Sequence, residues 1–162
     1  MRQILPSSGL LILGLVLGCT SVAIDTGQKS EGRNGQRYTA WRFSVDIPKG
    51  VSVRRRDSQL DFISYWFYLS DNTLPILYAY AGNQPKFPED VPQGSKKERI
   101  SIGSLDAESI VWTDEKGMSY RQALVRLPSH IKVPGYVYFK YTELREDQKA
   151  VADGIIQTIK PE

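Results

Sequence analysis

The chain has 162 residues, of which 41% are hydrophobic and 24% are charged, and its formal net charge is +3. This length and composition predict one domain with a packed core, which excludes wholesale disorder and a second large domain within these residues. The small net charge does not indicate nucleic-acid binding, so we expect no nucleic-acid partner.

The first 18 residues have the features of a secretory signal peptide. Arg2 supplies a positive start, residues 10–17 are almost entirely apolar, and the small residue Gly18 stands immediately before Cys19. The apolar run is shorter than the roughly 20 residues that a membrane-spanning helix needs. We therefore expect residues 1–18 to be a signal peptide that is removed.

The segment Val16-Leu17-Gly18-Cys19 resembles the lipobox of bacterial lipoproteins. This resemblance implies that the Cys19 thiol receives a diacylglyceryl group, that cleavage occurs before it, and that the new amino terminus is acylated. Several acyl chains hold a protein on a membrane, whereas one chain binds only marginally. Because Thr20 replaces the aspartate that retains enteric-type lipoproteins in the inner membrane, the resemblance implies the bacterial outer membrane, with the domain facing the periplasm. The alternative is a secreted protein with a chance cysteine.

Cys19 is the only cysteine of the chain. Once it is lipidated, no thiol remains for a disulfide, a thiolate metal site or a cysteine nucleophile. The residues that follow it are small, polar or glycine, so residues 19–36 are expected to form the lipidated cysteine and a flexible tether. The folded domain is then expected over residues 37–162.

Apolar residues alternate along most of this domain, as they do in β-strands. The predicted strands are residues 43–47, 51–53, 62–69, 76–81, 99–102, 107–112, 118–127 and 136–141. Pro48-Lys49-Gly50 predicts a hairpin between the first two strands, and residues 114–117 predict another hairpin. Residues 62–69 and 76–81 are apolar at both alternating positions, which predicts central strands covered on two sides.

The apolar spacing changes to that of an amphipathic helix in the last segment. The positions that share its apolar side are Val151, Ala152, Ile155, Ile156 and Ile159. Pro161 is expected to end the helix, and Gly154 is expected to allow close approach to a strand. The predicted fold class is therefore α+β, a mainly antiparallel β-sheet with a C-terminal amphipathic helix packed on it.

The strand and turn over residues 43–50, the antiparallel strands, and the closing segment of residues 152–160 resemble the Mog1/PsbP-like group of domains. The resemblance covers Tyr38 to Lys160. Members of that group are mostly non-catalytic binders and assembly factors, and similar small lipoprotein domains act as periplasmic immunity proteins against secreted toxins. The resemblance therefore implies protein binding. Residues 82–97 are proline-rich where the group often has a helix, so the resemblance leaves the number of helices open.

Catalytic and metal sites find little support in the residue pattern. His130 is the only histidine, which is too few for a histidine-based zinc site. A triad of Ser129 or another serine, His130 and a carboxylate would need a nucleophile context that surrounds no serine here. We therefore expect no metal, no cofactor and no enzymatic activity, and a small hydrolase that uses His130 remains an alternative.

The densest positive cluster is Arg54-Arg55-Arg56. Strand alternation would put Arg54 and Arg56 on one face and Arg55 on the other. The pair is a candidate contact for an acidic partner or for anionic lipid headgroups. The alternative is a solvated strand edge that discourages pairing with other strands.

Two further features are candidate contacts for a partner. Residues 65–68, 78–80 and 136–141 are rich in aromatic side chains, most of which should be core, but one tyrosine-rich face could serve recognition. The proline-rich segment of residues 82–94 carries Lys86, Phe87 and Glu89. Its extended backbone would lose little entropy on binding. The alternative is that Phe87 folds back onto the core.

These patterns predict an outer-membrane-anchored periplasmic lipoprotein that acts by non-catalytic protein binding. The sharper hypothesis is an inhibitor or immunity protein against a secreted toxin or an envelope enzyme. The alternative within the binding class is an accessory or assembly subunit of an envelope complex.

Overall fold

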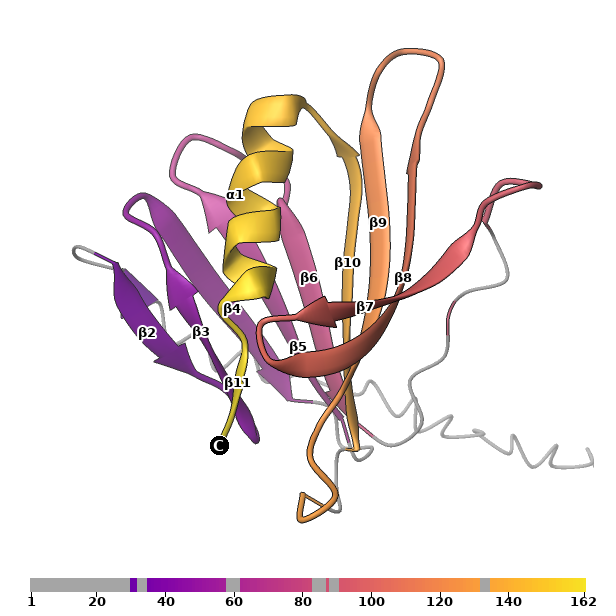
Figure 1. Ribbon diagram of the computed structural model, residues 1–162. Helices are drawn as coiled ribbons and strands as arrows, with labels where there is room; N and C mark the ends of the chain where they lie inside the picture. The colour runs from indigo at the N-terminus through magenta and orange to yellow at the C-terminus, as the bar shows by residue number, and fades with distance from the viewer. Residues whose placement is uncertain (1–29, 32–34, 58–61, 83–86, 88–90, 132–134) are drawn as a thin grey trace, which may run out of the picture.

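The computed structural model describes residues 30–31, 35–57, 62–82, 87, 91–131 and 135–162. These residues form two antiparallel β-sheets and one helix (Figure 1). The α+β class predicted from the sequence is thereby confirmed. The helix in the described part of the chain is not long and apolar enough to cross a membrane. The predicted signal peptide and Cys19 lie outside the described residues.

The larger sheet has eight strands in the order β1-β4-β5-β6-β10-β9-β8-β7. Neighbouring strands pair antiparallel throughout. The strands are β1 (Ser30–Glu31), β4 (Val51–Asp57), β5 (Phe62–Leu69), β6 (Leu77–Gly82), β7 (Lys97–Ile102), β8 (Leu105–Thr113), β9 (Ser119–Arg126) and β10 (Tyr136–Leu144).

The smaller sheet consists of β2 (Gln36–Thr39), β3 (Phe43–Ile47) and β11 (Lys160–Pro161), in the order β11-β3-β2. Together with the helix α1 (Glu146–Gln157), it forms a second layer over one face of the larger sheet (Figure 1). The opposite face of the larger sheet is turned away from both, and this asymmetry positions the candidate site.

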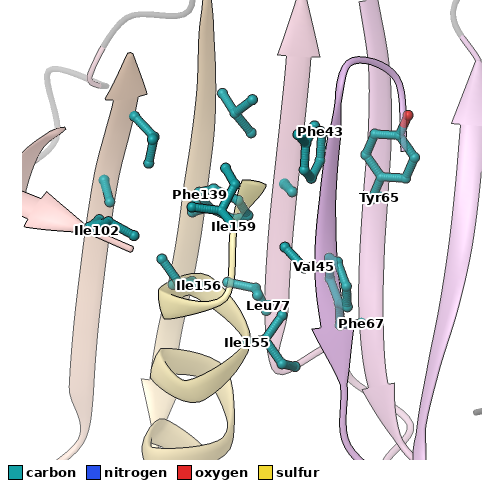
Figure 2. Close-up of a cluster of buried hydrophobic side chains, with 14 of the residues drawn as sticks. Phe43, Val45, Tyr65, Phe67, Leu77, Ile102, Phe139, Ile155, Ile156 and Ile159 are labelled. Atoms are coloured by element: carbon teal, nitrogen blue, oxygen red, sulfur yellow. The ribbon is translucent and has the colours of Figure 1, made fainter. Parts of the chain in front are cut away.

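The core fills the space between these two layers. Phe43 from β3 lies fully buried against Tyr65 from β5 and Phe139 from β10, with edge-to-face ring contacts at 5.6 and 6.0 Å (Figure 2). The helix adds its buried apolar side, Ala152, Ile155 and Ile156. The Tyr65 hydroxyl accepts a 2.8 Å hydrogen bond from the Trp41 backbone N–H, and burial raises the pKa of this hydroxyl to about 12.

The end of the helix is tied to both sheets by side-chain hydrogen bonds. The Thr158 hydroxyl donates to the carbonyl of Ile155 at 2.7 Å and accepts from the Asp46 backbone N–H at 2.8 Å. The Gly103 N–H donates to Gln157 Oε1 at 3.2 Å. Gly103 has a φ of +58°, and a Cβ there would lie 3.1 Å from the carbonyl oxygens of Gln157 and Ile159, so the turn between β7 and β8 reaches the helix end because it lacks a side chain.

The predicted hairpin around Pro48-Lys49-Gly50 is wrong. The turn itself forms, with a hydrogen bond from the Val51 N–H to the Pro48 carbonyl, but the strands on its two sides belong to different sheets. β3 pairs with β2 and β11, whereas β4 pairs with β1 and β5. The chain therefore crosses between layers at this turn. The second predicted hairpin is confirmed, because residues 114–117 join β8 to β9.

Three smaller expectations also differ from the structure. Part of the predicted tether is paired: Ser30–Glu31 forms β1 against β4, and Gln36 begins β2. Gly154 does not approach a strand, since a Cβ added there would meet no atom within 4 Å. β5 and β6 are fully covered on only one side, because their outward aromatic side chains remain half-buried.

Candidate functional site

The outward side chains of β4, β5 and β6 form a surface that we call the open aromatic face. It consists of Arg54, Arg56, Phe62, Trp66, Tyr68, Tyr78 and Tyr80. Strand alternation places these residues opposite Tyr65, Phe67 and Leu77, which point into the core. Because α1 and the smaller sheet lie on the core side, neither of them covers this surface (Figure 1).

The aromatic side chains of this face pack on one another. The Phe62 and Tyr80 rings stack at 5.1 Å, and the Trp66 and Tyr78 rings meet at 5.4 Å with a tilt of 58°. The Tyr78 hydroxyl lies 3.1 Å from the buried Ser64 hydroxyl, which is hydrogen-bonding distance. These contacts hold the rings in one arrangement before any partner arrives, so binding would cost little side-chain entropy.

Gly82 makes room for part of this arrangement. A Cβ at this position would lie 2.5 Å from the Phe62 Cβ and 2.9 Å from the Tyr80 hydroxyl oxygen. Phe62 and Gly82 are directly paired across β5 and β6. The absent side chain therefore lets Phe62 and Tyr80 close over the end of β6.

The structure places Arg54 and Arg56 on the outward face, in agreement with the alternation predicted from the sequence. The Arg54 guanidinium lies 4.7 Å from the centre of the Tyr68 ring, a cation–π distance. Arg55 points to the other face, where its Nε lies 2.7 Å from Asp57 Oδ1. Arg54 and Arg56 both lie beyond the positions of β4 that pair with the described residues of β1, and charge at such positions discourages further strand pairing.

Of the predicted contact residues Lys86, Phe87 and Glu89, the structure describes Phe87. Phe87 lies against Tyr138 of β10, with ring centres 6.4 Å apart, and the Lys97 ammonium lies 4.8 Å above the Phe87 ring. Lys97 also forms an ion pair with Glu108. Phe87 thus folds back onto the sheet, which is the alternative that the sequence left open. Lys86 and Glu89 lie outside the described residues.

Phe87 covers part of the outward side of the larger sheet at Tyr138. Beyond β6, the outward residues Tyr138, Gln122 and Ile110 are buried, with at most 6% of their surface exposed. Burial raises the pKa of the Tyr138 hydroxyl. The outward side is therefore closed around Tyr138, whereas β4, β5 and β6 carry the two predicted arginines, and beyond β6 Lys140 is half-buried and Arg126 is exposed.

His130 occupies an exposed turn between β9 and β10, in which the Ile131 N–H donates to the Pro128 carbonyl at 2.9 Å. Among the hydrogen bonds that join described residues, none involves the His130 imidazole or the Ser129 hydroxyl. The described residues also hold no group of three or more histidine, cysteine, aspartate or glutamate side chains arranged for a metal ion.

Several hollows lie elsewhere on the described surface. One of them, of about 700 Å³, lies at the β8–β9 hairpin beside the stacked rings of Trp112 and Tyr120. Asp114 closes the base of this hairpin, accepting from the Tyr120 hydroxyl and from two backbone N–H groups, and the bond from Met118 is the main cause of its lowered pKa. Another, of about 440 Å³, lies between α1 and β3 beside Gly154.

Sequence reasoning found the two arginines of the open aromatic face but did not name Trp66, Tyr68 or Tyr78 as contact residues. Alternation within β5 separates the half-buried Trp66 and Tyr68 from the core residues Tyr65 and Phe67. The missing information was which side of the sheet the helix covers. That information depends on tertiary packing and has no local signal.

No family model matches this chain, and no curated protein or solved structure is similar to it. The resemblances to bacterial lipoproteins and to the Mog1/PsbP-like group therefore remain predictions from the sequence.

Proposed function

We propose that this protein is a lipoprotein, anchored in the bacterial outer membrane through Cys19, whose domain binds another protein in the periplasm without catalysis. The observation that carries the proposal is the open aromatic face. Tryptophan, tyrosine and arginine are the residues that most often dominate the binding energy of protein interfaces, and this face presents all three.

The sharper form of the proposal is an inhibitor or immunity protein that neutralises a toxin or an enzyme in the envelope. Preordered ring contacts favour tight binding, which neutralising an enzyme requires. An accessory subunit of an envelope complex would use the same face. The two roles differ in the partner, which is one enzyme in the first case and resident envelope proteins in the second.

A crosslinked pull-down from native envelopes tests protein binding. We expect the full chain, tagged after Glu162, to capture a near-stoichiometric partner, and Trp66→Ala to lose most of it. The matched control is Trp112→Ala, which removes the same side chain from β8, outside the open aromatic face. Equal capture by both variants would remove this face from the proposal, and no captured protein in any sample would overturn protein binding.

Membrane anchoring has a separate test. We expect Cys19→Ser to move the protein from the membrane fraction to the soluble fraction, because serine cannot form the thioether that carries the diacylglyceryl group. Thr20→Ala is the control and should leave the protein on membranes. If Cys19→Ser still partitions into detergent like the unmodified sequence, the anchor is not at this residue.

A further inference from the structure

The register of four strands brings charged and aromatic side chains into one row on the outward side of the larger sheet. Arg54 pairs with Trp66, Trp66 pairs with Tyr78, and Tyr78 pairs with Lys140. We call these four residues the cation–aromatic row. With strands about 4.8 Å apart, the backbone positions of Arg54 and Lys140 at its ends are about 14 Å apart.

The surface around the row is positive. Arg56 on β4 and Arg126 on β9 are also outward, and the outward positions of β4, β5, β6, β9 and of β10 up to Tyr141 hold no aspartate or glutamate. None of Arg54, Arg56, Lys140 and Arg126 forms an ion pair with a described residue. Asp57, the acidic residue nearest in sequence to Arg54 and Arg56, pairs with Arg55 instead.

We propose that the cation–aromatic row binds an acidic protein surface, one that presents an apolar patch between carboxylates at the spacing of Arg54 and Lys140. This inference rests on the proposed function and names the chemistry of its partner. The cations at the two ends would pair with carboxylates, and the rims of Trp66 and Tyr78 would contact the apolar patch between them. Complementary charge of this kind raises the association rate and excludes basic partners.

The packing of the rings favours a protein over a nucleic acid or a membrane. Base stacking needs free ring faces, but the Trp66 and Tyr78 rings contact each other at 5.4 Å with a tilt of 58° and are half-buried. Insertion into a bilayer interface needs protruding apolar side chains, whereas Trp66 and Tyr78 are half-buried. A surface that combines the exposed Arg54 and the half-buried Lys140 with half-buried aromatic side chains suits another protein.

The test uses a defined acidic polypeptide, a fluorescein-labelled glutamate–tyrosine copolymer, and the full-length chain in detergent. We expect binding, measured by fluorescence anisotropy, to weaken at least tenfold when Arg54→Glu and Lys140→Glu are combined. The matched control combines Lys49→Glu and Lys116→Glu, which changes the net charge equally at two exposed turn residues and should weaken binding less than twofold. Arg54→Lys with Lys140→Arg should retain binding, because the charges stay in place.

Competition distinguishes the other possible ligands. Phosphatidylglycerol vesicles and an oligothymidine should each compete at least tenfold more weakly than the unlabelled copolymer at 150 mM salt. Stronger competition by either would overturn the acidic-protein assignment in favour of a membrane or a single strand. Equal losses in the row variant and the control variant would show that only net charge matters, and absence of copolymer binding would also overturn the inference.

Failure of this inference can be told apart from failure of the proposed function. If the charge-reversed row variant still captures the envelope partner that the unmodified chain captures, protein binding stands and the acidic-partner inference is wrong. If neither protein captures a partner, the proposed function itself fails.

Discussion

Replacing Phe43 with alanine is expected to lower the free energy of unfolding by about 4 kcal/mol, the largest loss we predict for one side chain. The ring is fully buried and joins the two layers, because it belongs to β3 of the smaller sheet and contacts Tyr65 and Phe139 of the larger sheet (Figure 2). Its removal would leave a cavity between two sheets whose backbones are held by their own hydrogen bonds and cannot collapse to fill it.

Denaturant unfolding followed by tryptophan fluorescence would measure this loss as a shift of the midpoint at unchanged slope. Tyr136→Ala is the control, since this aromatic residue of β10 is 38% exposed and should cost less than 1 kcal/mol. A loss below about 1.5 kcal/mol for Phe43→Ala would show that the two layers are not joined through this ring.

Local patterns were sufficient for most of the secondary structure. The helix was predicted because its apolar spacing is a property of neighbouring residues, and its buried apolar residues Ala152, Ile155 and Ile156 are among those that the spacing placed on one side. The strand at residues 43–47 was predicted for the same reason. Its partners were not, because β11 begins at Lys160, more than a hundred residues away, where only the end of a helix was expected.

The candidate site shows the same limit. Alternation was enough to place Arg54 and Arg56 on one face, since it depends on residues within one strand. The cation–aromatic row depends on the register of three strand pairs, the last of which joins Tyr78 to Lys140. No short sequence pattern specifies that register, because the register depends on which face of each strand is buried in the core of the assembled sheet. Phe87 illustrates the point, since its sequence suited both a contact loop and the position over Tyr138 that the structure shows.

Removing the Arg121 guanidinium is expected to loosen the attachment of α1 to the larger sheet. Its Nη1 lies 2.6 Å from Asp153 Oδ1, and its Nε donates to the Ser109 hydroxyl at 3.2 Å. The Arg121 and Asp153 side chains are only 13% and 28% exposed, so solvent screens the pair less than it screens a surface ion pair. Arg121→Met, which keeps the apolar stem, should cost about 2 kcal/mol of the free energy of unfolding, because it leaves a partly buried carboxylate without its cation.

A double-mutant cycle separates the pair from the general effect of each substitution. The loss in Arg121→Met with Asp153→Ala should be smaller than the sum of the two single losses by about 1 kcal/mol, since the second substitution removes the carboxylate that the first leaves unpaired. Lys149→Met is the matched control on the same helix, where the partner Glu146 is 80% exposed, and it should change the free energy of unfolding by less than about 0.5 kcal/mol. Strictly additive losses at Arg121 and Asp153 would show that α1 is held by its apolar side alone, through Ile155 and Ile156, and that the ion pair only accompanies that packing.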